Sequence, residues 1–85
     1  MDLQTLSTLK VTAHARLAMR ERDVRPEEVI AVLRDPQVVE PHEGRERYVR
    51  NGLVAVIVWE GERPVLVTVL LRKRETWTNA DARRR

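Results

Sequence analysis

One histidine and three arginines in the first third of the chain are the residue types best suited to chemistry. His14 precedes Arg16, Arg20 and Arg22 by two, six and eight residues. An imidazole exchanges a proton near neutral pH, and arginine binds phosphate oxygens through paired hydrogen bonds. A proton carrier beside several cations is the requirement for phosphodiester cleavage by general acid–base transfer.

RNA cleavage fits this set because the ribose 2′-hydroxyl is itself the nucleophile, so a protein needs only a base, an acid and cations. We assign His14 as the proton carrier, Arg22 and Arg47 as phosphate contacts, and Tyr48 as a stacking or proton-donating group. A structural interpretation stays open for each. The imidazole could bond a backbone carbonyl, the arginines could form a solvated helix face, and the tyrosine could pack.

Further basic residues are candidates for nucleic-acid binding. The chain has a net charge of +3, and residues 72–85 carry six basic residues against Glu75 and Asp81. Clustered arginine and lysine neutralise phosphates and make binding salt-dependent. The candidates are Arg16, Arg20, Arg72, Lys73 and Arg74. The alternative for the C-terminal cluster is a solubilising tail.

Composition excludes several other classes. Eighty-five residues make one small domain, and the chain has no cysteine. Disulfides, thiolate metal sites and cysteine nucleophiles are therefore excluded, which fits a reducing cytoplasm. There is no glycine-rich phosphate loop and no His/Cys cluster, so we expect no cofactor and no metal. We also expect no signal peptide and no membrane span.

Two short helices are predicted in the N-terminal half. Thr12 is a suitable N-cap for a helix from about Ala13 to Arg22, and Asp23 could end it in the left-handed conformation. Pro26 opens a second helix that stops at Asp35-Pro36. The expected buried residues are Ala15, Ala18 and Met19 in the first helix, and Val29, Ile30 and Leu33 in the second.

The second half predicts strands. Arg45–Arg50, Leu53–Trp59 and Val65–Leu71 form a three-stranded antiparallel meander, with Val38-Val39 as a further edge strand. Asn51-Gly52 is a strong hairpin signal, and its two-residue loop fixes the pairs Arg50–Leu53, Val49–Val54, Tyr48–Ala55 and Arg47–Val56. We therefore expect an α+β fold, with two N-terminal helices packed on a three- to four-stranded antiparallel sheet. Its parts are an arm (1–11), a domain (12–74) and a basic tail (75–85).

The central strand is apolar on both faces, and two helices can cover only one. With an even second loop, one face carries the valines Val54, Val56, Val58, Val65, Val67 and Val69, and we expect the helices there. The other face would then expose an apolar patch. Its candidate partner-binding residues are Leu53, Ile57, Leu66, Leu70 and the tail residue Trp77. The C-terminal tail with Trp77, together with a second copy or a partner such as an antitoxin or a host protein, could cover this patch, or the N-terminal arm could fold across it.

Several pieces of the chain together resemble a known family. They are His14-Ala15 with Met19, Arg22 and Val24, then Pro26-Glu27-Glu28-Val29, Arg47-Tyr48 and Val65–Val69. This combination resembles the small bacterial and phage proteins of the domain of unknown function 4258 family, over about residues 12–72. The ending Trp77-Thr78-Asn79-Ala80 is similar to actinobacterial and actinophage members. Ala18 stands where members often have arginine, and Asp23 where they often have glycine.

The resemblance implies a fold like that of RelE-like toxins, including the BrnT type, which are metal-independent ribonucleases. The expected function is a toxin-like ribonuclease or RNA-binding domain of a bacterial or phage conflict system. The alternative is a non-enzymatic accessory protein that binds a host protein through its sheet face. His14 and Arg22 match the family's helix pattern, and Arg47-Tyr48 match its strand pattern. The arginine missing at Ala18 counts against catalysis unless Arg16 or Arg20 substitutes for it.

Overall fold

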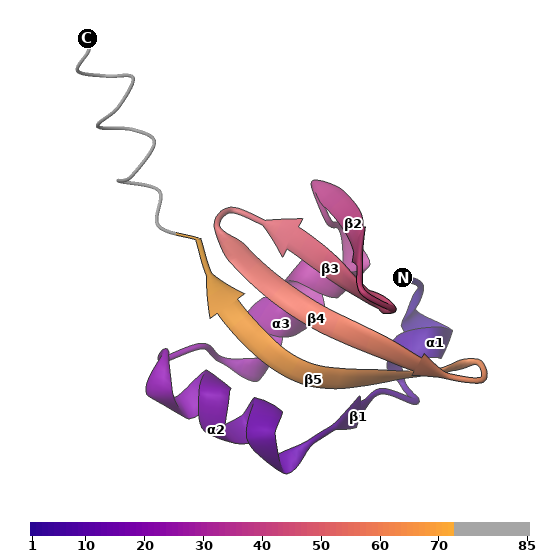
Figure 1. The fold of residues 1–85 in the computed structure, drawn as a ribbon, viewed down its shortest axis with the longest axis horizontal. Helices are drawn as coiled ribbons and strands as arrows, with labels where there is room; N and C mark the ends of the chain where they lie inside the picture. Colours follow the sequence, from indigo (N-terminus) through magenta and orange to yellow (C-terminus); the bar gives the residue numbers. More distant parts are fainter. Residues whose placement is uncertain (73–85) are drawn as a thin grey trace, which may run out of the picture.

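A computed structural model describes residues 1–72 as three helices and a five-stranded mixed sheet (Figure 1). The helices are α1 (Leu3–Leu6), α2 (Ala13–Glu21) and α3 (Pro26–Arg34). The strands are β1 (Lys10–Val11), β2 (Val38–His42), β3 (Arg45–Arg50), β4 (Leu53–Glu60) and β5 (Arg63–Leu71). Their order is β1-β5-β4-β3-β2, and only β1 is parallel to its neighbour. The α+β class is confirmed. The predicted two helices and three- to four-stranded antiparallel sheet are corrected to three helices and a five-stranded mixed sheet, because α1 and β1 are each too short to show a period.

The two longer helices begin at the predicted residues, and they end within one residue of the predicted ends, since α2 stops at Glu21 and α3 at Arg34. The Thr12 hydroxyl accepts a hydrogen bond from the backbone N–H of Ala15 at 3.0 Å. Asp23 has a φ of 56°, and the N–H of Val24 donates back to the Met19 carbonyl at 2.8 Å. This is the left-handed helix ending that glycine adopts most easily. In α3, Ile30 is exposed (43 %), while Val32 is buried (2 %), which corrects our predicted core face.

The hairpin register is as predicted. Arg50, Val49, Tyr48 and Arg47 pair with Leu53, Val54, Ala55 and Val56. Asn51 and Gly52 have φ values of 50° and 84°, the left-handed pair that a two-residue turn needs. Glu43-Gly44, with φ values of 53° and 78°, makes a second turn of the same kind between β2 and β3.

A β-bulge in β5 changes the faces of its last residues. Val56 pairs with Thr68 and Ile57 with Leu66, so Val67 is the extra residue. Such a bulge inserts one residue and bends the strand. Val65 and Val67 lie on the face predicted for the valines. Val69 lies on the opposite face, and Thr68 and Leu70 lie on the valine face in its place.

The helices cover the opposite face from the one we expected. Leu53, Ala55 and Ile57 of β4 join one core with residues of α2 and α3, including Ala15 and Leu33. Leu53, Ile57 and Leu66 are only 8 %, 0 % and 1 % exposed. The predicted uncovered patch is therefore wrong, because the helices occupy it. The N-terminal arm contributes to this cover through Met1, Leu6, Leu9 and Val11. Leu70 is 37 % exposed on the other face, and Trp77 lies outside the described residues.

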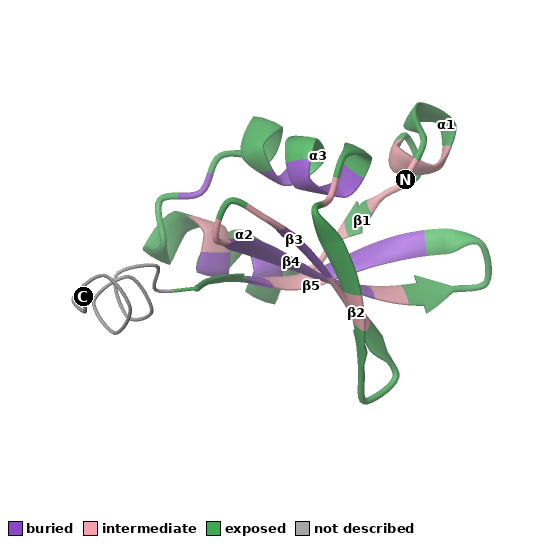
Figure 2. Ribbon diagram, turned by 90° about the horizontal axis from the view of Figure 1, so that it is seen from above, coloured by how far each residue is buried: buried purple, intermediate pink, exposed green. Residues whose placement is uncertain are grey.

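The face without helices in residues 1–72, here the open face, is curled. Arg72 follows β5 and Glu40 lies on β2, with β4 and β3 between these two strands, yet their side chains meet at 2.6 Å. Such a contact requires the sheet to bend so that its two sides approach across this face. Val49, Val54 and Val56 are consequently buried there without a helix above them. Figure 2 shows α1 and α3 on one side of the sheet and the β2–β3 hairpin projecting from the other.

Candidate nucleic-acid interface

The open face contains a recess of about 320 Å³ that combines cations with an apolar floor. Arg47, Val56 and Thr68 lie in one row across β3, β4 and β5, since Val56 pairs with both of the other two. The residues that line the recess are His42, Glu43, Arg45, Arg47, Val56, Thr68 and Leu70. This volume is near the lower end of the range for small-ligand sites.

The β2–β3 hairpin positions two of the charged groups. His42 and Arg45 are the last pair before the Glu43-Gly44 turn, so both project from the hairpin end toward the recess. The His42 Nε2 atom lies 3.7 Å from the Glu43 Oε2 atom. A carboxylate at this distance helps to orient the ring.

The arginines of the recess have no acidic partner among residues 1–72. Neither Arg45 nor Arg47 forms an ion pair there, although Glu40 stands directly opposite Arg47 in the ladder. Glu40 instead accepts a hydrogen bond from Arg72 at 2.6 Å. Two guanidinium groups with free donors, side by side on a concave surface, are suited to binding phosphate.

Other arginines are occupied within the fold. Arg22 lies 3.7 Å from a Glu21 carboxylate oxygen, and Arg50 donates to the backbone carbonyl and the carboxylate of Asp35 at 3.0 and 3.3 Å. The Arg50 contacts tie β3 to the end of α3. Within the described residues, Arg45 and Arg47 lie in a recess without an ion pair, whereas Arg16 and Arg20, which also form none, are exposed on α2.

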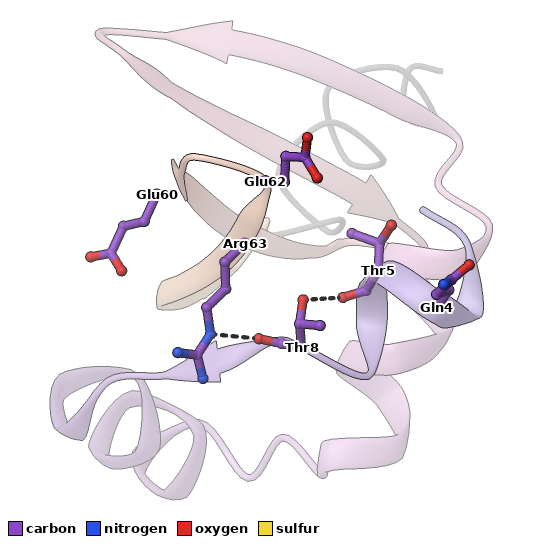
Figure 3. Close-up of a pocket in the computed structure, with 6 residues that line it drawn as sticks. All are labelled: Gln4, Thr5, Thr8, Glu60, Glu62 and Arg63. Carbon is purple, nitrogen blue, oxygen red and sulfur yellow. Dashed lines mark hydrogen bonds between the residues drawn. The ribbon is translucent and has the colours of Figure 1, made fainter.

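A larger, shallow recess of about 890 Å³ lies at the far end of the sheet (Figure 3). Arg63 donates from Nε to the Thr8 carbonyl at 2.8 Å, and the Thr8 hydroxyl donates to the Thr5 carbonyl at 2.8 Å. The arginine therefore holds the N-terminal arm against β5. Glu60 and Glu62 also line this recess. The two carboxylates lie beside an arginine that already donates to the Thr8 carbonyl, so this larger recess is unsuitable for an anion.

The four predicted catalytic residues are not brought together. His14 is exposed on α2 and Arg22 follows that helix, both in the helix layer. Arg47 lies on the open face, and Tyr48 points to the helix side because neighbours in a strand alternate. His14 and Arg47 are consequently on opposite sides of the sheet. Arg47 is the member of this set that lines the recess.

Tyr48 packs in the core and has a structural role. It is 8 % exposed, and its hydroxyl donates to the Glu46 Oε1 atom at 3.1 Å. The Trp59 indole N–H donates to the same oxygen at 2.8 Å. Burial, together with the Glu46 carboxylate, raises the pKa of Tyr48 to about 12. The phenol is thus neutral and already engaged, so it neither transfers a proton readily nor stacks on a base at the open face.

The predicted nucleic-acid-binding residues also occupy different places. Arg16 and Arg20 are exposed on α2, and Arg72 is paired with Glu40. Lys73 and Arg74 lie outside the described residues. Our sequence analysis did not select His42 or Arg45. The available signal was weak, because Gly44 between two extended runs is compatible with a turn, but glutamate is not among the residues preferred before it.

The described residues offer little for a metal. In residues 1–72, no three histidine, aspartate or glutamate side chains come together as ligands. No helix in the same range is long and apolar enough to cross a membrane.

Comparison with curated proteins and with solved structures gave no match. A protein-family model, described as a domain of unknown function (DUF4258), matches residues 11–71. The match spans the parallel edge strand, both longer helices and the whole antiparallel meander, so it includes His42, Arg45, Arg47 and Thr68. The chain therefore belongs to the domain of unknown function 4258 family.

Proposed function

We propose that the protein is a toxin-like RNA-binding domain that holds the RNA backbone on the open face of its sheet. The observation that carries the proposal is the recess in which Arg45 and Arg47 lie without a carboxylate partner in residues 1–72. A RelE-like relationship belongs to the same proposal. Helices packed on one face of an antiparallel meander leave the other face free for substrate.

The chemistry of the recess favours a single strand. A curled sheet encloses a narrow concave surface, and its volume of about 320 Å³ suits one nucleotide unit better than a duplex. Thr68 supplies a hydroxyl that can bond a ribose 2′-hydroxyl. Tyr48 and Trp59, the aromatic residues among residues 1–72, lie toward the helix side. Binding should therefore depend on phosphate contacts, and hence on salt, more than on base stacking.

Fluorescence anisotropy with a short labelled single-stranded RNA tests this proposal. Arg47→Ala should weaken binding about tenfold and lower the salt dependence by about one phosphate contact. Arg34→Ala is the matched control, because it removes the same charge from the exposed last turn of α3. An equal loss in both variants would mean a diffuse charge effect and would overturn the assignment.

RNA cleavage is a second candidate, favoured by the position of His42. The residue lines the same recess as Arg47, whereas His14 does not. In this reaction the 2′-oxygen gives its proton to the imidazole and attacks phosphorus. The bond from phosphorus to the 5′-oxygen breaks, that oxygen takes a proton from water, and a 2′,3′-cyclic phosphate remains. Arg45 and Arg47 would stabilise the charge on the pentacoordinate phosphate.

A cleavage assay compares the wild type with two histidine variants. His42→Ala should abolish cleavage, and His14→Ala should leave it unchanged. Cleavage lost only in His14→Ala would move the reaction to the helix layer. RNA that is bound but never cut by the wild type would leave binding as the function of the site.

A further inference from the structure

Glu40 is an acidic residue placed to neutralise the positive charge of Arg47 in the recess. It pairs directly with Arg47 in the β2–β3 ladder, and both side chains project to the open face. Side chains directly opposite each other in an antiparallel pair are about 5 Å apart at Cβ, close enough for opposite charges to attract. A carboxylate there can neutralise Arg47 and repel a phosphate.

Arg72 holds that carboxylate. Its backbone N–H donates to the Gly52 carbonyl at 2.8 Å, which fixes the residue at the end of β5. Its guanidinium Nη2 atom then reaches the Glu40 Oε1 atom at 2.6 Å, across the curled face. A charge-assisted hydrogen bond of this length is short and strongly oriented. Arg47 forms no ion pair with Glu40 in this arrangement.

We propose that Arg72 is a positioning residue of the RNA site: it holds the Glu40 carboxylate and so keeps Arg47 available for phosphate. This inference rests on the proposed function. It assigns Arg72 a role different from the direct phosphate contact expected from the sequence. If Arg72 is removed, Glu40 turns to the guanidinium that stands opposite it.

A double-mutant cycle in the RNA-binding assay separates the two roles. Arg72→Ala should weaken binding about tenfold, comparable to losing the Arg47 contact itself. Adding Glu40→Gln to Arg72→Ala should restore binding to within about twofold of the wild type, because no carboxylate remains to pair with Arg47. Glu40→Gln alone should change binding less than about threefold. Arg72→Lys keeps the cation and should bind like the wild type.

A direct phosphate contact by Arg72 gives a different pattern. The loss in Arg72→Ala would then persist in the double variant, and Glu40→Gln would have the same effect in both backgrounds. Either result overturns the inference. Far-UV circular dichroism and amide spectra confirm that each variant is folded.

A second readout works without RNA. The Nε–H resonance of Arg47, followed by nuclear magnetic resonance, should shift in Arg72→Ala and return in the double variant. An unchanged resonance in Arg72→Ala overturns the inference even if RNA binds. If the wild type binds no RNA but the Arg47 resonance still shifts in Arg72→Ala, the result contradicts the proposed function. It leaves in place the exchange of the Glu40 ion pair from Arg72 to Arg47.

Discussion

The two faces of the sheet are built from the same strands and have opposite characters. On the helix-covered face, Leu53, Ala55 and Ile57 are buried in one core with α2 and α3, and no polar side chain is buried in the described residues. On the open face, the intervening residues of the same strands combine valines with charged and polar side chains, as in the cross-strand row Glu40, Arg47, Val56 and Thr68. A period of two lets one set of strands supply both a closed core and a charged surface. The folding free energy should therefore come mainly from one face and ligand binding from the other.

The strongest test of this division is a pair of identical substitutions in β5. Leu66 is 1 % exposed under the helices, and Leu70 is 37 % exposed on the open face. Leu66→Ala should lower the free energy of unfolding by about 3 kcal/mol, because it removes buried contacts and leaves a cavity. Leu70→Ala should lower it by less than about 1 kcal/mol. Urea denaturation followed by circular dichroism measures both.

Equal losses would contradict the division, because they would mean that the open face is as tightly packed as the core. A small domain has a free energy of unfolding of only about 5–10 kcal/mol, so Leu66→Ala is best measured at low temperature. Its effect is read from the shift of the urea midpoint. Leu66→Met, which conserves volume, provides the control and should cost under about 1.5 kcal/mol.

The sequence predicted local features that arise from neighbouring residues. Thr12, Asp23 and Pro26 determine helix ends through their own hydrogen bonds and φ angles. Asn51-Gly52 determines a hairpin register without reference to the rest of the fold. The assignment of the faces failed because valine and leucine or isoleucine are both apolar, so pattern alone did not decide which side the helices cover. The bulge at Val67 carries no signal in a run of β-branched residues.

The candidate site was predicted only in part, for a related reason. Arg47 could be chosen because its strand and register were clear. His42 and Arg45 join it through a turn whose first residue, Glu43, is an unusual choice for a positive φ. The contact between Arg72 and Glu40 depends on the curl of the whole sheet, and no local pattern predicts a contact over 32 residues.

An intermediate effect is expected at Tyr48, which links the core to the rim of the helix-covered face. Tyr48→Phe removes the hydrogen bond to Glu46 and should cost about 1 kcal/mol at neutral pH. The pKa of the phenol is raised from 10.0 to about 12 in the folded protein. Its contribution to stability is therefore complete below pH 10 and is lost as the pH rises from 10 toward 12.

Urea denaturation at pH 8 and at pH 11 checks this sign. The wild type should lose more stability between the two than Tyr48→Phe does, because Tyr48 is the chain's one tyrosine and both proteins share every other titrating group. Parallel losses in the two proteins would show that the phenol is not specifically stabilised in its neutral form. A larger loss in the variant would contradict the raised pKa of the phenol.

The smallest effect is expected at the two hairpin turns, which differ in how well their residues suit left-handed φ values. Asn51-Gly52 uses the preferred residues for left-handed φ values, whereas Glu43-Gly44 places glutamate at a φ of 53° beside the recess. Glu43→Asn should raise the free energy of unfolding by about 0.5 kcal/mol, and the reciprocal Asn51→Glu should lower it by a similar amount. Thermal denaturation of both variants provides the measurement.

If Glu43→Asn destabilises the protein instead, the contact of 3.7 Å between His42 and Glu43 outweighs the backbone strain. If it stabilises the fold but weakens RNA binding, the strained glutamate is retained to orient His42, and the open face is the place where the molecule gives up stability for its function.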